Sequence, residues 1–117
     1  MQLNEISFYQ LENLIMQRVP FKFLNFSDEQ KLLSAFAHLN SYYMRFLKDQ
    51  LFSITTEENA LELISSQSFP LDMPMVLLCE EGTSSTSLAQ KLEQNGFKNV
   101  YVIAAGLRQL LQDAKSN

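Results

Sequence analysis

The sequence has few of the side chains that cross-link a chain or bind a metal ion. Among its 117 residues there is one cysteine, Cys79, and one histidine, His38. A single cysteine cannot form a disulfide within the chain, so a cytoplasmic location is the default expectation. One cysteine and one histidine also cannot supply the ligands of a structural zinc site, and we therefore expect no metal.

Clustered positive charge and long apolar runs are also missing. The chain has 9 Lys and Arg residues against 13 Asp and Glu residues, which gives a formal net charge of -4. Because no basic cluster could contact a phosphate backbone, we expect no nucleic-acid partner. No apolar run is long enough to cross a bilayer, and residues 1–9 lack the basic start of a secretory signal, so we expect no membrane partner. The sequence leaves the oligomeric state open.

The composition that remains is typical of a folded globular chain. Hydrophobic residues make up 46% and charged residues 19% of the sequence. A chain of this length can bury a substantial core, and no repeat, low-complexity tract or linker divides it. We therefore expect residues 1–117 to form a single domain.

Three capping-box patterns predict helix starts in the first half of the chain. In each of them a Ser or Thr is followed three residues later by Gln or Glu: Ser7–Gln10, Ser27–Gln30 and Thr55–Glu58. Apolar residues at helical spacing follow all three patterns. We expect Pro20 to end the first helix and the apolar stripe of the second to run to Leu39.

Short apolar runs and punctuating residues predict the remaining elements. Strands are expected at 21–26, 43–47, 75–78 and 99–103, and a loop at 65–74. A helix is expected at 84–95, capped by Ser84 and ended by Gly96, and an amphipathic helix closes the chain. Strands that are separated by helices indicate a parallel sheet covered on both faces, with its ligand site at the carboxyl ends of the strands.

Cys79 falls at such a carboxyl end. It directly follows the apolar run 75–78 and precedes the helix at 84–95. The first N–H groups of a helix lack partners within it and carry partial positive charge, so a thiol that faces them ionises more readily. The thiolate is the nucleophilic form of cysteine. The competing interpretation is a buried small apolar side chain at a strand end.

The order of motifs around Cys79 identifies a family. The apolar strand leads into Cys79-x-x-Gly82-x-x-Ser85, and the next helix ends in Asn95-Gly96-Phe97. The strand near Val100 follows, and Gly106 opens the last helix. This order resembles the rhodanese-like domain, and all three glycines of the chain lie where the family pattern has glycine. Upstream, Phe23-Leu24-Asn25-Phe26 is similar to the family's second strand, and His38-Leu39 to the segment before its third strand.

The resemblance implies a fold, a chemistry and a set of site residues. The fold is a single α/β domain, with helices on both faces of a mainly parallel sheet of about five strands. The chemistry places sulfane sulfur on a catalytic Cys79 as a persulfide, without a metal or an organic cofactor. Asn25 and His38 would line the pocket, although structural hydrogen bonding is the competing interpretation for both. The sulfur would be surrounded by a loop of backbone N–H groups that comprises Glu80, Glu81, Gly82, Thr83, Ser84 and Ser85.

Two residues of this loop depart from the family pattern. The family often has an arginine directly after the cysteine and another near Ser84, whereas this chain has Glu80 and Glu81. A carboxylate about 6 Å from the sulfur, at an effective dielectric constant of about 40, would disfavour the thiolate by roughly 1.4 kcal/mol. A dianionic donor such as thiosulfate therefore fits poorly, and a neutral, cationic or protein-bound sulfur donor fits better.

We consider three functions at this stage. The first is a rhodanese-like sulfurtransferase or persulfide carrier, which exchanges sulfur with a donor and an acceptor thiol or protein. The second is a catalytically inactive rhodanese-like module that regulates or binds a protein. The third, a cysteine phosphatase, needs an arginine six residues after the cysteine, where this chain has Ser85. The B component of sugar phosphotransferase systems also has a Cys-x-x-Gly loop, but there the strand usually opens the domain.

For aromatic residues core packing is the default, although an exposed Tyr42-Tyr43 pair beside the cysteine loop would suit protein docking.

Overall fold

A five-stranded sheet forms the centre of the molecule. The computed structural model describes residues 4–80, 83–103 and 106–115. The strands are β1 (Asn4–Ile6), β2 (Lys22–Asn25), β3 (Leu51–Ser53), β4 (Met75–Leu78) and β5 (Val100–Ile103). Their order in the sheet is β1-β5-β4-β2-β3, and every neighbouring pair is parallel.

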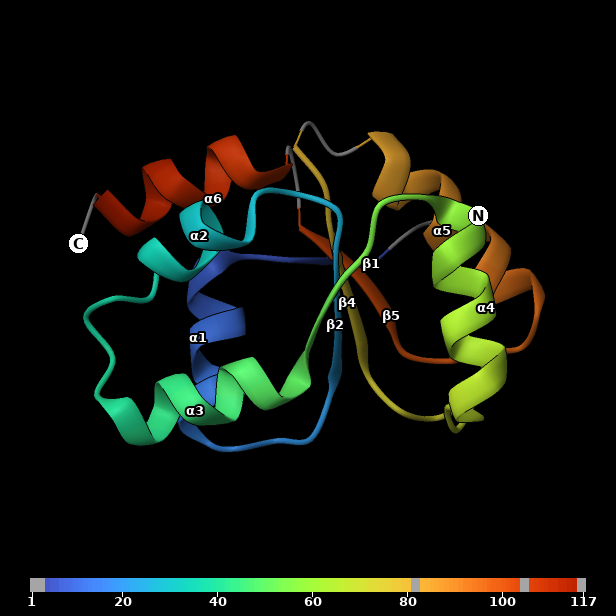
Figure 1. The fold of residues 1–117 in the computed structure, drawn as a ribbon, viewed down its shortest axis with the longest axis horizontal. Helices are drawn as coiled ribbons and strands as arrows, with labels where there is room; N and C mark the ends of the chain where they lie inside the picture. The colour runs from blue at the N-terminus through green and yellow to red at the C-terminus, as the bar shows by residue number, and fades with distance from the viewer. Residues whose placement is uncertain (1–3, 81–82, 104–105, 116–117) are drawn as a thin grey trace.

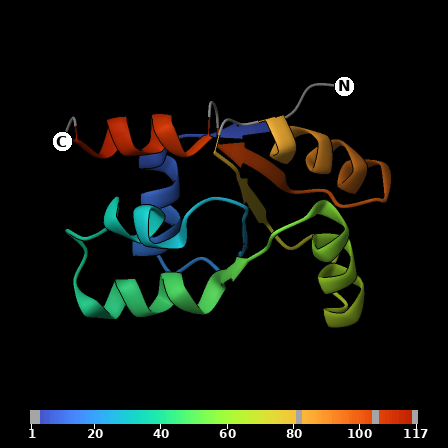
Figure 2. The same ribbon diagram turned by 45° about the horizontal axis from the view of Figure 1, so that its top comes forward.

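Helices cover both faces of this sheet. They are α1 (Phe8–Met16), α2 (Glu29–Ser34), α3 (Ser41–Gln50), α4 (Glu57–Gln67), α5 (Thr83–Gln94) and α6 (Gly106–Lys115). Helices α1, α2, α3 and α6 lie on one face, and α4 and α5 lie on the other (Figure 1; Figure 2). The predicted fold class, an α/β sheet that is mainly parallel and covered on both faces, is confirmed.

Strand β4 joins the two cores because its side chains alternate between the faces. Val76 and Leu78 pack in the core that includes α1 and α6, whereas Met75 and Leu77 pack in the core that includes α4 and α5. All four side chains are fully buried. Burying a side chain of this size contributes about 1.5–3 kcal/mol, so β4 is firmly held and its carboxyl end is a rigid place for a functional residue.

The first helix begins as its sequence predicts. Ser7 Oγ accepts a hydrogen bond from the Gln10 N–H, and Gln10 Oε1 accepts one from the Ser7 N–H, which completes a capping box. We expect Ser7→Ala to lower the free energy of unfolding by about 1 kcal/mol, because one helix N–H loses its partner. Urea denaturation measures this change, and an unchanged midpoint would show that the cap contributes nothing.

The expected strand at 43–47 is wrong, because this segment lies within helix α3. The Asn40 side chain accepts a hydrogen bond from the Tyr43 N–H and caps the helix. Tyr43, Met44 and Leu47 then face the core at helical spacing. The edge strand is β3, directly after this helix; it has three residues, which is too short for a visible alternation. Strand β1 was missed for the same reason.

Two of the predicted helix caps are shifted by one residue. Asp28, and not Ser27, caps α2, because its side chain accepts from the Lys31 N–H while Ser27 is bonded to Asn25. Thr56, and not Thr55, caps α4. Both errors arise because neighbouring residues could each serve as the cap, and tertiary contacts select one of them.

Other boundaries differ modestly from the expectations. Helix α2 ends at Ser34 and turns follow it towards Leu39, while α4 continues to Gln67. Helix α5 begins at Thr83, so Ser84 lies inside its first turn and is not its cap. The predicted end at Gly96 is confirmed: its φ is 96°, and the Phe97 N–H donates to the Leu92 carbonyl at 3.1 Å.

Candidate functional site

Cys79 lies immediately beyond β4, at the carboxyl edge of the sheet. Its side chain is 5% exposed. On the neighbouring strand, the Phe26 N–H donates to the Leu78 carbonyl at 2.8 Å, which fixes the backbone just before Cys79. The thiol therefore occupies the position where parallel α/β sheets bind ligands, between the central strand and the helix that follows it.

The sulfur of Cys79 contacts the first turns of α5. Cys79 Sγ lies 3.3 Å from Ser85 Oγ, and the Ser85 side chain is fully buried. A hydroxyl at this distance can donate a hydrogen bond to a thiolate, which favours the charged form of the sulfur. Ser85 and Cys79 are therefore in contact and both buried, six residues apart in the sequence Cys79-x-x-Gly82-x-x-Ser85.

This contact leads to a testable expectation. Ser85→Ala removes the hydroxyl beside the sulfur and is expected to slow alkylation of Cys79 by iodoacetamide at pH 7 about fivefold, because roughly 1 kcal/mol of thiolate stabilisation is lost. The matched control is Ser87→Ala, which removes an exposed hydroxyl from the same helix. Equal alkylation rates in wild type and Ser85→Ala would show that the hydroxyl does not stabilise the thiolate.

A backbone hydrogen bond joins the start of α6 to Cys79. The Leu107 N–H donates to the Cys79 carbonyl at 2.9 Å. Gly106 has a φ of 74°, and a Cβ atom there would lie 2.5 Å from the Cys79 carbonyl oxygen and 2.6 Å from that of Glu80. Only glycine allows this approach. Gly106, which the sequence pattern predicted, therefore allows α6 to lie against the end of β4 that leads into Cys79.

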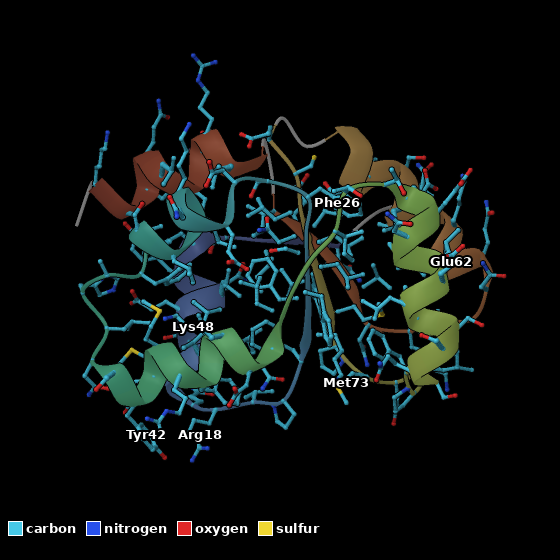
Figure 3. All side chains as sticks on the ribbon, in the orientation of Figure 1. Arg18, Phe26, Tyr42, Lys48, Glu62 and Met73 are labelled. Atoms are coloured by element: carbon cyan, nitrogen blue, oxygen red, sulfur yellow. The ribbon has the colours of Figure 1, made fainter. Side chains whose placement is uncertain are left out.

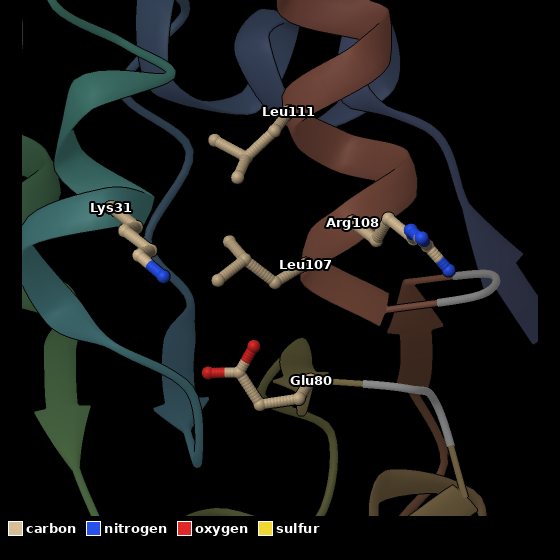
Figure 4. A pocket seen from close by; sticks show the side chains of 5 residues that line it. All are labelled: Lys31, Glu80, Leu107, Arg108 and Leu111. Atoms are coloured by element: carbon tan, nitrogen blue, oxygen red, sulfur yellow. The ribbon is translucent and has the colours of Figure 1, made fainter.

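Glu80 is directed at α2 and α6, on the face opposite α5. Its Oε1 accepts a hydrogen bond from the Asp28 N–H at 3.1 Å, and its side chain borders a surface recess between α2 and α6 (Figure 4). Cys79, in contrast, contacts Ser85 on α5, which covers the other face. Consecutive residues thus point to opposite faces, and the Glu80 carboxylate anchors the loop to the start of α2.

Asn25 supports this anchor from β2. It is fully buried, its Oδ1 accepts from the Ser27 N–H at 2.9 Å, and its Nδ2 donates to the Ser27 carbonyl at 3.2 Å. In the sheet register Asn25 pairs with Leu78, the residue before Cys79. The Asn25 side chain therefore shapes the turn that presents the Asp28 N–H to Glu80.

His38 has a different set of partners. Its Nε2 pairs with Glu12 of α1, and its ring lies 6.2 Å from that of Phe8. The His38 side chain is 50% exposed. These contacts correspond to the structural interpretation of His38, and none of them joins it to the cysteine loop.

The rest of the expected loop is only partly described. Glu81 and Gly82 lie outside the described residues, and so do the side chains of Thr83 and Ser84. Within the ranges that are described, no three His, Cys, Asp or Glu side chains gather closely enough to hold a metal ion. The same ranges contain no helix that is both long and apolar enough to cross a membrane.

The aromatic pair Tyr42-Tyr43 lies far from this site. Tyr42 is 55% exposed, and the Arg18 guanidinium lies over its ring at 4.8 Å. Figure 3 shows Tyr42 and Arg18 at the bottom of the molecule and Phe26 in its upper half. Phe26 marks the place of the cysteine, because its N–H is bonded to the carbonyl of Leu78, the residue before Cys79. The pair is therefore not beside the cysteine loop, because α3 replaces the strand that was expected to carry it there.

Sequence reasoning missed two contributors to the site. These are the N–H of Leu107, which holds the Cys79 carbonyl, and the N–H of Asp28, which holds Glu80. Both are backbone donors from distant segments, so no side-chain pattern could have revealed them. The glycine at position 106 was the only available signal, since it indicated a close backbone approach.

Comparisons with known proteins agree with this fold. The sequence matches the rhodanese-like domain family over residues 38–113. This match covers more than half of the chain, so the protein belongs to the rhodanese-like domain family. Comparison with curated protein sequences gives no significant match.

Solved structures show the same architecture at low sequence identity. A rhodanese-like domain protein from Staphylococcus aureus superimposes with a TM-score of 0.61 at 15% identity, covering 92% of this chain and 91% of that one. A single-domain sulfurtransferase from Saccharomyces cerevisiae has a TM-score of 0.61 at 12% identity, covering 100% and 95%. These similarities concern the fold.

Proposed function

We propose that this protein is a persulfide carrier of the sulfurtransferase type, with Cys79 as the sulfur-bearing residue. The observation that carries the proposal is the placement of Cys79 at the carboxyl end of the central strand, with Sγ 3.3 Å from the Ser85 hydroxyl. Membership of the rhodanese-like family and the similarity to a single-domain sulfurtransferase support it. The loop amides of residues 80–85 are proposed to stabilise the sulfur.

The proposed reaction has two balanced steps. In loading, the Cys79 thiolate attacks the outer sulfur of a donor persulfide, R–S–SH. The donor S–S bond breaks, R–S⁻ leaves with the electron pair of that bond, and Cys79–S–SH forms. In discharge, an acceptor thiolate attacks the outer sulfur, Cys79 leaves as the thiolate, and the acceptor becomes the persulfide.

The composition of the chain restricts the partners of these steps. Cys79 is the only cysteine in the sequence, so the persulfide cannot be resolved internally and needs an external thiol or protein. The sequence has carboxylates at positions 80 and 81 where cations would attract an anionic donor. We therefore propose a small or protein-bound persulfide donor in preference to thiosulfate. A cytoplasmic location, where thiols stay reduced, suits this chemistry.

Sulfur loading tests the proposal directly. Purified protein is incubated with polysulfide, desalted and analysed by intact mass spectrometry. The expected product is heavier by about 32 Da, the mass of one sulfur atom, and a reducing thiol returns it to the starting mass. Protein that gains no sulfur under conditions that load free cysteine would contradict the proposal.

A non-enzymatic binding module is the second candidate. The burial of Cys79, at 5% exposure, and the carboxylates that replace the family's arginines favour it. This function predicts no sulfur adduct and binding of a protein at the same edge of the sheet. The cysteine-phosphatase hypothesis has less support, because the position that needs an arginine holds the buried Ser85.

A further inference from the structure

Phe26 is the neighbour of Cys79 on the adjacent strand. In the register of β2 and β4, Asn25 pairs with Leu78. The pairing continues past this point, because the Phe26 N–H donates to the Leu78 carbonyl at 2.8 Å. Neighbouring strands lie about 4.8 Å apart, so the residues that follow this pair, Phe26 and Cys79, are side by side at the carboxyl edge of the sheet.

Ile54 continues the same row from β3. In the register of β2 and β3, Asn25 pairs with Ser53, and the Ile54 N–H donates to the Asn25 carbonyl at 2.9 Å. The three strands therefore present Ile54, Phe26 and Cys79 in this order across the edge of the sheet.

The three side chains of this row lie on the face that α4 and α5 cover. Phe26 and Ile54 pack against the core that includes these two helices, and the Cys79 sulfur contacts Ser85 of α5. Both apolar side chains are partly exposed, whereas Leu24, two residues before Phe26 on β2, is fully buried. Phe26 and Ile54 thus form an apolar wall that borders the cysteine on the face of its sulfur and is partly open to solvent.

This apolar wall suits one class of sulfur donor. In the loading step of the proposed function, the R group of R–S–SH is attached to the sulfur that leaves, one atom beyond the sulfur that Cys79 attacks. The R group therefore lies at the edge of the site, where partly exposed side chains border the thiol. An aromatic or aliphatic R group that packs on the wall is removed from water, whereas a charged group would lose hydration there without gaining a partner from the wall.

We infer that Phe26 and Ile54 select a persulfide donor whose R group is aromatic or aliphatic. The inference rests on the proposed function, in which the Cys79 thiolate attacks the outer sulfur of the donor. The donor S–S bond breaks, R–S⁻ leaves with the electron pair of that bond, and Cys79–S–SH forms. Phe26 and Ile54 determine specificity and take no part in the exchange itself.

Two donors that differ in their R group test this selectivity. Benzyl persulfide carries an aromatic ring, and 2-hydroxyethyl persulfide carries a hydroxyl group. Phe26→Ala is expected to slow sulfur loading from the benzyl donor about tenfold and to leave loading from the hydroxyethyl donor within about twofold of wild type. Phe26→Leu, which keeps an apolar side chain, should retain most of the preference. Comparing variants with the same donor cancels its intrinsic reactivity.

The matched control is Phe97→Ala. Phe97 is also a partly buried phenylalanine that packs against the same core, but it precedes β5 and so lies at the amino edge of the sheet. Its substitution should leave the preference between the two donors unchanged. Ile54→Thr keeps a branched side chain and adds a hydroxyl to the wall; it is expected to lower the preference about threefold, and it tests the wall even if Phe26→Ala does not fold.

Alkylation of Cys79 tests the wall independently of sulfur transfer. Relative to free cysteine, wild-type protein should react faster with N-benzyliodoacetamide than with iodoacetamide, and Phe26→Ala should remove this advantage. That result in protein that takes up no sulfur would support the wall and contradict the carrier function. Protein that loads sulfur without preferring the benzyl donor, or a Phe26→Ala variant that slows both donors by the same factor, would overturn the inference and leave the carrier function standing.

Discussion

Cys79→Ser is expected to abolish sulfur loading while leaving the fold intact. Wild-type protein treated with polysulfide should gain about 32 Da, and the variant should gain nothing, because a serine hydroxyl does not ionise at neutral pH and forms no persulfide. Serine differs from cysteine in one atom and remains next to Ser85, so the free energy of unfolding should change by about 1 kcal/mol or less. Intact mass spectrometry measures the first quantity and urea denaturation the second.

The methionines provide an internal check on this experiment. The chain has 5 of them, and each methionine that is oxidised to the sulfoxide gains one oxygen atom. Two such oxidations add almost the same mass as one sulfur atom, about 32 Da. Peptide mapping of the loaded protein must therefore place the adduct on the peptide that contains Cys79. An adduct of the same mass that a reducing thiol removes from Cys79→Ser would refute the assignment of Cys79 as the sulfur carrier.

Gly106→Ala is expected to destabilise the protein more than any other glycine substitution that the described residues permit. Its Cβ would lie 2.5 Å from the Cys79 carbonyl oxygen, and its φ of 74° already disfavours a side chain. Left-handed strain and steric overlap together should lower the free energy of unfolding by about 3 kcal/mol. The variant should also load sulfur more slowly, because relief of the overlap moves the backbone of Cys79 and Glu80.

Gly96→Ala is the matched control, because it has the strain without the overlap. Its φ is 96°, and the nearest atom to its Cβ would be Leu71 Cδ1 at an ordinary 3.7 Å. We expect this variant to lose about 1 kcal/mol and to load sulfur at the wild-type rate. If urea denaturation shows equal losses for the two variants, the close approach of α6 to the Cys79 carbonyl does not contribute to stability.

The Glu80 carboxylate does not face the Cys79 sulfur, although the two residues are adjacent in the sequence. In the sequence, Glu80 is adjacent to the thiol and counts as a repulsive charge. In the structure its carboxylate accepts from the Asp28 N–H, towards α2, while Cys79 contacts Ser85 on α5. Side chains of consecutive extended residues point to opposite faces, so adjacency in sequence does not bring the carboxylate to the sulfur.

The core elements of the fold follow from local patterns. Continuous apolar runs predicted β4 and β5, and apolar residues at helical spacing predicted α1, α5 and α6, since each of these elements buries its own apolar residues. The elements that were wrong or missed are β1, β3 and α3, at the edges of the sheet. There, short segments with few buried residues are decided by their neighbours: β1 by pairing with β5, and β3 by pairing with β2.

The sequence by itself determined that Cys79 ends the central apolar strand and that Gly82, Gly96 and Gly106 lie at the spacing of a rhodanese-like chain. It also determined the absence of a second cysteine and of cations beside the first one. Only the tertiary structure decided what surrounds the strand end. The donors from Leu107 and Asp28 come from segments tens of residues away. They reach Cys79 and Glu80 because a parallel sheet brings the carboxyl ends of its strands, and the helix starts that follow them, to the same edge.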